Sequence, residues 1–418
     1  MMHLTPIKKL ERFLSTDTTY LARGSFWMSL GSIVNMGIAL LLSIAYARYI
    51  PKETYGSYRY VFSLLGAAGI FALPGMAVII TQSVARGFLG TYRRANRIIF
   101  YGSIGISIIS VGASIFFFQQ NNLTLAIAFL ASAIGTPFVE GLGNWKGYYD
   151  GMKAFKRKTM LNIKIKIFYG ISMLSAIFCI WFFYLPPTIA TALLVSAYVI
   201  PLGIANIFVV RRTFREIPTD APVEPGAIPY GVHLSLASVP TTIASYIDGL
   251  IVFHYLGPVA LATYSFATAI PDQIKVILIN IANTTTPKLA QREFTIEQKK
   301  DLAKKLFRAS ALTALAILGY IIVAPLIYTI FFNRYTDAIA YSQVFAVSLA
   351  LFPFGIFGNA IRAEGNITKN YILDSTVSGI QIVALIMLIP WYGLWGAVWA
   401  RVTGRFANNF FSYVLFRY

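Results

Sequence analysis

The chain has 418 residues, of which 57% are hydrophobic and only 12% are charged. A soluble protein of this length carries about 25% charged residues, so the composition excludes a soluble globular protein and indicates a membrane protein. The formal net charge is +19, but the basic residues lie mostly in short connectors between apolar segments. The positive-inside rule explains that placement, and we expect no nucleic-acid partner.

Apolar segments of about 20 residues, long enough to cross a bilayer, recur along the chain. The segment 1–24 precedes them, and its stretch "LTPIKKLERFL" places leucine and isoleucine on one helical face, which predicts an interfacial helix. The predicted fold is an all-α polytopic membrane protein. It has twelve spans, at 25–47, 60–83, 98–118, 123–145, 160–183, 188–210, 232–255, 260–284, 306–330, 339–361, 371–389 and 393–415.

Lysine and arginine predict the direction of these spans. If the N-terminus is cytoplasmic, the cytoplasmic segments hold 26 of the 35 basic residues and the external loops hold four. This bias over short loops places both termini in the cytoplasm. The external loops, such as 119–122 and 184–188, are too short to hold a catalytic domain.

A repeat divides the chain into two halves. With a shift of 206 residues, "SLGS" (29–32) aligns with "SLAS" (235–238), and Tyr58 aligns with Tyr264. Aligned helices start on the same side, so the repeat is parallel. We therefore expect a six-helix lobe on either side of a linker, around a central cavity, with pseudo-two-fold symmetry. The boundaries are 25–210 for the N-terminal lobe, 211–231 for the linker and 232–418 for the C-terminal lobe.

The sequence predicts no cofactor and no metal. Cys179 is the only cysteine, so no intramolecular disulfide can form. The three histidines have no metal-ligand spacing, and no "G….GK[ST]" nucleotide-binding loop occurs.

Three segments resemble one family of membrane proteins. "ARYIPKETYGSYRYVFSL" (47–64) resembles the junction of the first two helices of polysaccharide flippases, and "SYIDGLIVFHYLGPVALATYSFATAI" (245–270) resembles the corresponding stretch of their second half. "IPWYGLWGAVWARVTGR" (389–405) resembles the start of their last helix. The chain is thus similar to the Wzx-type O-antigen and oligosaccharide flippases of the multidrug/oligosaccharidyl-lipid/polysaccharide (MOP) exporter superfamily. It departs from the family at Arg401 and Arg405, which replace apolar residues, and at Gly249, where a basic residue is common.

The resemblance implies a flippase of the bacterial inner membrane that acts by alternating access. Its cargo would be an oligosaccharide on undecaprenyl pyrophosphate, turned from the inner to the outer leaflet for O-antigen or a related glycan. Membrane lipids, a polymerase and other glycan-assembly proteins are the implied partners, and the transport unit is expected to be a monomer. Two alternatives stay open. They are a drug/cation antiporter of the same superfamily and an O-antigen polymerase or ligase, although such an enzyme needs a large external loop.

Several charged residues lie at or near the ends of the predicted spans. Arg48 and Arg59 flank the first external loop, where they would meet the diphosphate as it leaves or would snorkel at the interface. We expect Glu140, near the inner end of the fourth span, to form a cytoplasmic gate with a loop lysine rather than to bind an ion. Lys164 and Lys166 are predicted to snorkel.

The seventh and eighth spans carry carboxylates inside the membrane. Asp248 and Asp272 are candidates for coupling transport to H⁺ or Na⁺, and the alternative is an ion pair with an arginine. Lys275 follows Asp272 by three residues, so the two can pair on one helical face.

The last span contains two arginines on one face, Arg401 and Arg405. At 1.5 Å per residue they lie roughly 12 Å and 18 Å below Gly393, too deep to reach water easily. We expect both to line the cavity and, with Lys275, to bind the diphosphate, because the guanidinium group pairs with phosphate oxygens. The alternatives are a structural pair with a carboxylate such as Asp374 or Asp272, or span ends placed wrongly.

Overall fold

The computed structural model describes residues 18–289, 296–350, 352–355, 357–358 and 367–417, and every regular element in these residues is a helix. The predicted interfacial helix in 1–24 falls almost entirely outside them. The elements in chain order are α2 (Thr18–Tyr49), α3 (Lys52–Ala68), η1 (Gly69–Ala72), α4 (Met76–Ala85), α5 (Leu89–Gln119), α6 (Leu123–Glu140), α7 (Trp145–Gly151), α8 (Phe155–Phe182), α9 (Pro187–Glu216), α10 (Ala227–Ala237), α11 (Val239–Leu289), α12 (Ile296–Phe331), η2 (Asn333–Ala338), α13 (Ile339–Val347), η3 (Phe352–Gly355), α15 (Ile367–Tyr392) and α16 (Leu394–Arg417).

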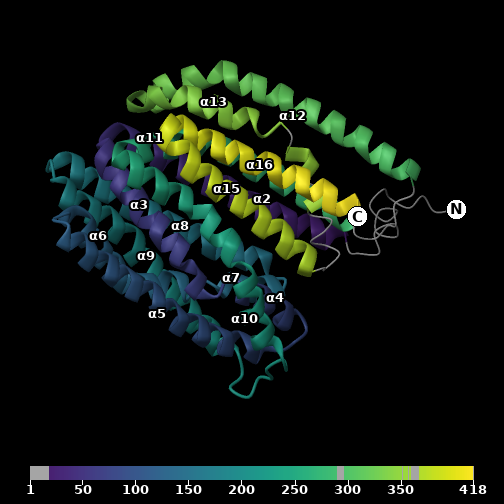
Figure 1. The fold of residues 1–418 in the computed structure, drawn as a ribbon. Helices are drawn as coiled ribbons and strands as arrows, with labels where there is room; N and C mark the ends of the chain where they lie inside the picture. Colours follow the sequence, from purple (N-terminus) through teal and green to yellow (C-terminus); the bar gives the residue numbers. More distant parts are fainter. Residues whose placement is uncertain (1–17, 290–295, 351, 356, 359–366, 418) are drawn as a thin grey trace.

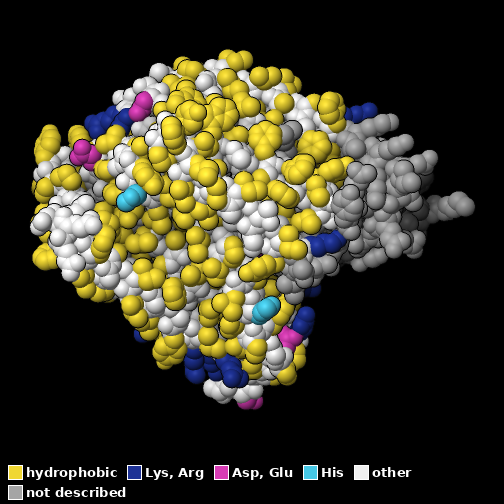
Figure 2. Space-filling view, viewed as in Figure 1, with side chains coloured by type: hydrophobic (Ala, Val, Ile, Leu, Met, Phe, Trp, Pro, Cys, Tyr) yellow, Lys and Arg dark blue, Asp and Glu magenta, His cyan; other side chains and the backbone are white. Residues whose placement is uncertain are grey.

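The long helices lie side by side in two groups (Figure 1). The first contains α5, α6, α8 and α9, and the second contains α12, α13, α15 and α16. On the face drawn in Figure 2, hydrophobic side chains cover most of the described surface, and charged side chains gather toward its edges. Among the described residues, eight helices are long and apolar enough to cross a membrane, or nine if one bent pair counts as a single span. The all-α membrane fold is thus confirmed, and the count of twelve spans stays a prediction.

The second predicted span, 60–83, is broken. α3 and η1 are bent by 48° from α4 at residues 73–75. Leu73 has a left-handed backbone (φ 50°, ψ 66°) and precedes Pro74. A residue before proline is disfavoured in the right-handed helical region, and this explains why the helix ends there.

The seventh and eighth predicted spans share one element, α11, which has two arms. The arms meet at Gly257, whose φ of 80° and ψ of −176° are not helical. Glycine adopts such angles without steric cost because it has no Cβ. The predicted start of the seventh span forms a separate helix, α10, which ends before Pro240 in the first turn of α11.

The predicted linker, 211–231, overlaps two helices. α9 continues to Glu216, so 211–216 are helical, and the connector before α10 is 217–226. It is held against the N-terminal lobe, because the Gly90 amide donates to Pro222 O (3.0 Å) and the Glu224 carboxylate accepts from the Ser83 hydroxyl and pairs with Arg86. The hydrogen bond from Ser83 and the charge and hydrogen bond of Arg86 lower the pKa of Glu224.

α3 and the first arm of α11 run antiparallel in very close contact, joining the two lobes. A Cβ on Gly56 would lie 1.8 Å from the Pro258 carbonyl oxygen, and one on Gly66 would lie 2.3 Å from the Tyr246 ring. From the second arm, Ser265 Oγ accepts a hydrogen bond from Arg59 Nε (3.2 Å). These two residues are 206 positions apart, so positions that the sequence repeat makes equivalent meet at the lobe interface, as expected near a pseudo-two-fold axis.

The lobes are also tied together at the end of the bundle that we predict to be external. Lys52 Nζ pairs with Asp337 Oδ2 (2.9 Å), and Asp337 also accepts from Thr263 Oγ1 (3.1 Å). Arg48 Nη2 donates to Ile330 O on α12 (2.8 Å). We call these contacts the outer clasp.

Candidate functional site

A cavity of about 1460 Å³, which we call the central chamber, lies among α2, α3, α6, α8, α9 and α11. α2 lines it from Ser25 to Tyr46, a helical length of roughly 30 Å, which is close to the hydrocarbon thickness of a bilayer. Its far end reaches Tyr46 and Tyr55, close to the outer clasp. The chamber is therefore deep along the bundle, and the outer clasp lies next to one end of it.

Three charged side chains line the central chamber: Arg59, Lys166 and Glu140. In the described part of the chain, Arg59 has a hydrogen bond to Ser265 and no carboxylate within ion-pair distance. Lys166 Nζ lies 5.2 Å from the centroid of the Tyr169 ring, and likewise no described carboxylate pairs with it. Two cations whose charge is not neutralised by an ion pair therefore face this space.

Tyrosine rings form much of the chamber wall. They come from five helices, and several contact one another, with centroids 5.0 Å apart for Tyr46 and Tyr55 and 5.5 Å apart for Tyr169 and Tyr198. The buried hydroxyl of Tyr46 has no hydrogen-bond partner among the described residues. Tyrosine rings can stack on sugars and their hydroxyls can bond to them, so this wall suits a cargo that carries hydroxyl groups.

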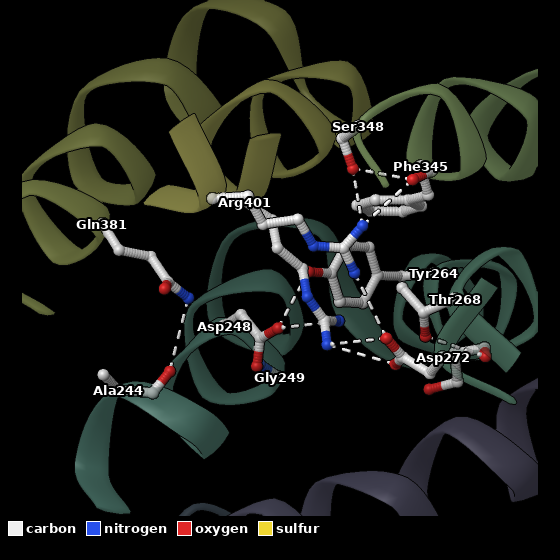
Figure 3. A network of polar contacts seen from close by, with 12 residues as sticks. Ala244, Asp248, Gly249, Tyr264, Thr268, Asp272, Phe345, Ser348, Gln381 and Arg401 are labelled. Carbon is white, nitrogen blue, oxygen red and sulfur yellow. Dashed lines mark hydrogen bonds and ion pairs between the residues drawn. The ribbon is translucent and has the colours of Figure 1, made fainter. Parts of the chain in front are cut away.

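A second cavity, of about 530 Å³, lies in the C-terminal lobe and is lined by half of the predicted site residues, namely Asp248, Lys275, Arg401 and Arg405. Figure 3 shows the polar network beside it. Arg401 reaches two carboxylates at once, with Nη1 3.4 Å from Asp248 Oδ2 and Nη2 3.1 Å from Asp272 Oδ2. Asp248 is fixed further by hydrogen bonds from the Tyr264 hydroxyl and the Gly249 amide, both 2.8 Å.

Arg405 joins the same network through Asp272, with Nη2 3.2 Å from Oδ1. Its Nη1 donates to Phe345 O (3.0 Å) and Ser348 Oγ (2.6 Å). Both guanidinium groups also lie over the Phe345 ring, 5.8 Å and 5.9 Å from its centroid. We call Asp248, Asp272, Arg401 and Arg405 the ion-pair cluster.

The second arm of α11 separates the two cavities. Gln273 and Val276 line the central chamber, whereas Lys275 lines the cavity of the C-terminal lobe. A smaller space of about 380 Å³ shares Glu140 and Tyr246 with the chamber, and Thr241 with the C-terminal cavity. Polar surface therefore continues from one lobe to the other around this helix.

The structure brings Asp248, Lys275, Arg401 and Arg405 to one cavity, with Asp272 bonded to both arginines. The diphosphate role predicted for these cations remains untested. The arginines do line a cavity, yet they also form the ion pair with Asp272 that was the alternative. Asp272 pairs with them rather than with Lys275, which has no ion pair to a described residue.

The other predicted residues lie elsewhere. Arg59 faces the central chamber, but Arg48 belongs to the outer clasp and does not line the chamber. Glu140 lines the chamber. Among the described residues, no lysine forms the predicted ion pair with it. Sequence reasoning missed Lys166. α8 begins at Phe155, five residues before the predicted span, so Lys166 lies roughly 16 Å along the helix, where it lines the chamber.

The chain is similar to known proteins over most of its length. Residues 21–293 match the family described as polysaccharide biosynthesis protein, which is well over half of the chain. The chain belongs to the polysaccharide biosynthesis protein family. It is also 22% identical, over 429 aligned positions, to the uncharacterized membrane protein MJ1068 of Methanocaldococcus jannaschii, and the match covers 92% of this chain and 81% of the relative.

Solved structures with a similar fold come from the MOP superfamily. An inward-facing multidrug resistance transporter of the MATE family matches with a TM-score of 0.65 and 14% identity, over 92% of this chain and 97% of its own. The lipid II flippase MurJ, in an inward closed conformation, matches with a TM-score of 0.65 and 12% identity, over 94% and 87%. A MOP superfamily transporter of Pyrococcus furiosus matches with a TM-score of 0.53 and 14% identity, over 94% of each chain. At identities this low, the similarity to these structures shows the fold of the chain alone.

Proposed function

We propose that the chain is a flippase for a lipid-linked oligosaccharide, with undecaprenyl pyrophosphate as the carrier and O-antigen or a related glycan as the product. The observation that carries the proposal is the central chamber, which combines cations that no described carboxylate pairs with, tyrosine rings and a depth close to that of the bilayer. Membership of the polysaccharide biosynthesis family and the MurJ-like fold support it.

The diphosphate needs a site in the chamber because a bare charge in hydrocarbon faces a barrier of tens of kcal/mol at a dielectric near 4. Arg59 and Lys166 meet this need, since neither is neutralised by a described carboxylate. Arg401 and Arg405 are less available, because they already bind Asp248 and Asp272. In our proposal the glycan then lies against the tyrosines, whose rings can stack on sugars and whose hydroxyls can bond to them.

In the proposed transport cycle, the outer clasp holds the state in which the external end of the chamber is closed. With Lys52, Asp337 and Arg48 engaged, the chamber is closed at the predicted external end. In the proposed cycle the cargo enters from the cytoplasmic leaflet, the clasp opens, and the lobes rock about the contact of α3 with α11. Asp248 and Asp272 are proposed to couple this step to an H⁺ or Na⁺ gradient, because intramembrane carboxylates are the usual groups for that task.

The charges of the chamber favour an anionic cargo over the cationic drugs of an antiporter. Arg59 and Lys166 are two cations against the single carboxylate of Glu140. The solved structures with a similar fold are transporters and a flippase, so we do not propose an enzymatic reaction.

The test removes both chamber cations and measures export of the glycan at the cell surface. R59Q/K166Q should insert and fold normally but export at least about 10-fold less, because each charge-assisted hydrogen bond contributes roughly 1.5–3 kcal/mol. The matched control is R94Q/R97Q, which removes two exposed arginines of α5 and should export at the normal rate. Normal export by a well-expressed R59Q/K166Q would overturn the proposed site.

The direction of transport has its own test. In a C179A background, a single cysteine at 119–122 or 184–188 should react with a membrane-impermeant reagent in intact cells, whereas one in the connector 217–226 should not. Labelling of the connector from outside would reverse the orientation.

A further inference from the structure

A third cavity, separate from both of those described above, lies between the start of α2 and the start of α8. It has a volume of about 550 Å³, and its apolar part is formed by Trp27, Phe155, Met160 and Leu161. α2 divides it from the central chamber, because Gly24 and Trp27 face this cavity while Ser25 and Met28 face the chamber. Phe26 beside it is 61% exposed and Met160 is 45% exposed, so the cavity lies next to apolar surface that would contact lipid. We call it the basal groove.

Five cations surround this apolar surface. They come from the turn after α7, from α8 and from α9, and they are Lys153, Lys156, Arg157, Lys164 and Arg212. Glu216 pairs with Arg157 and lies 3.6 Å from Arg212, so it offsets only part of this charge. Even with Lys153 left out, the four cations Lys156, Arg157, Lys164 and Arg212 face this one carboxylate, so the groove keeps an excess of positive charge beside an apolar surface.

The local structure turns these cations toward one place. Lys156 lies over Trp27, with Nζ 5.4 Å from the ring centroid. Lys153 has a left-handed backbone (φ 56°) in the turn that ends α7. Simple snorkelling at an interface does not require cations to converge from three segments.

We propose that the basal groove binds an anionic phospholipid of the surrounding leaflet. The phosphate of the headgroup pairs with Lys156 and Lys164, and the upper part of an acyl chain lies on Trp27, Met160 and Leu161. Basic pockets between transmembrane helices are established sites for anionic headgroups. A soluble phosphate would satisfy the cations but would leave the apolar part exposed, so the lipid fits the groove as a whole.

The experiment titrates delipidated, full-length protein in a neutral detergent with phosphatidylglycerol, and it counts bound lipids by native mass spectrometry. The wild type should retain phosphatidylglycerol in preference to phosphatidylcholine. K156Q/K164Q should bind phosphatidylglycerol about 10- to 30-fold more weakly, because each lysine near a lipid surface contributes roughly 5-fold to affinity. M160W should also bind more weakly, because the larger side chain fills the apolar part while every charge remains.

The matched control is R94Q/R97Q, which removes the same charge from exposed positions outside the groove and should bind like the wild type. Wild-type binding by K156Q/K164Q would overturn the proposal, and so would an equal loss in R94Q/R97Q, which would show non-specific attraction. Millimolar inorganic pyrophosphate should not displace the lipid, and its displacement at that concentration would show that the groove takes soluble phosphate instead. Because lipid is counted directly, these results do not depend on whether the protein is a flippase.

Discussion

The central chamber and the ion-pair cluster both contain arginines inside the membrane, yet the two regions use them differently. In the chamber, Arg59 has one hydrogen bond to a serine and no described carboxylate partner. In the cluster, Arg401 binds two carboxylates and Arg405 shares one of them. From this difference we infer that the chamber cations are the ones available to a cargo, because no described carboxylate already neutralises them.

The difference has a physical reason in desolvation. A charge moved away from water must recover its hydration energy from partners, and a buried pair does so internally. The side chain of Arg401 is 22% exposed and that of its partner Asp248 only 10%, so these two groups depend on each other. Arg59 is exposed to the chamber and can keep water until a cargo replaces it. We therefore expect substitutions in the cluster to lower mainly the stability of the fold, and substitutions in the chamber to lower mainly transport.

The largest effect is expected when the cluster loses its central cation. R401Q leaves Asp248 without its charged partner and weakens the hold on Asp272, and breaking a buried pair costs about 3–5 kcal/mol. The partial exposure of Asp272 places the loss toward the lower end. Thermal unfolding in detergent should show a markedly lower unfolding temperature for R401Q and little change in that temperature for R59Q.

A second substitution separates lost pairing from lost packing. R401Q/D248N removes the stranded carboxylate and should recover part of the stability. If R401Q unfolded at the same temperature as the wild type, the contrast between the cluster and the chamber would be wrong.

A smaller effect on folding, with a clear effect on coupling, is expected from the carboxylates. In D272N, Arg401 keeps Asp248, and Arg405 keeps Phe345 O and Ser348, so the protein should still fold. If Asp272 couples transport to an ion, flipping in proteoliposomes should lose its dependence on the imposed gradient while cargo binding persists. D248N provides the parallel test, and unchanged gradient-driven flipping in both variants would make the two aspartates structural partners only.

Opening the chamber at its closed end should give a moderate effect. K52E places a carboxylate against Asp337, and because exposed pairs are worth only about 0.2–1 kcal/mol, external access should rise roughly 2- to 5-fold. The measurement is labelling of a cysteine at the chamber residue Ser43, in a C179A background, by a membrane-impermeant reagent. The charge swap K52D/D337K should restore the low rate, and persistently high labelling in the swap would exclude the ion pair as the cause.

The smallest effect concerns the connector between the lobes and its pH dependence. Ser83 and Arg86 hold the pKa of Glu224 below its ordinary value of 4.5, so the ionised carboxylate favours docking above that value. The contribution is lost as the pH falls through the lowered pKa of the docked state. Hydrogen exchange of the Gly90 amide, corrected for its intrinsic pH dependence, should therefore show weaker protection at the acid end. E224Q should show weak protection at every pH, and a wild-type-like pH profile in E224Q would assign the effect to another group.

The sequence by itself determined the class of the protein and most of its helices. Hydrophobic composition and runs of about 20 apolar residues decide that a chain enters a membrane, because each helix satisfies its own backbone hydrogen bonds there. α16 therefore matches its predicted span closely, whereas α5 begins nine residues before its span. The depth of Arg401 and Arg405 below Gly393 could be calculated from helical rise alone. The helix breaks also have local causes in the sequence, at Pro74 and Gly257, although their effect on the spans was not predicted.

Only the tertiary structure decided which charges meet. Arg401 is 153 residues from Asp248 and 129 from Asp272, and no local pattern specifies contacts over such separations. The same holds for Lys166, whose place in the chamber depends on how α8 packs beside α2 and α9. Helix formation is a local property of the backbone, whereas the partner of a buried charge depends on which helices lie side by side.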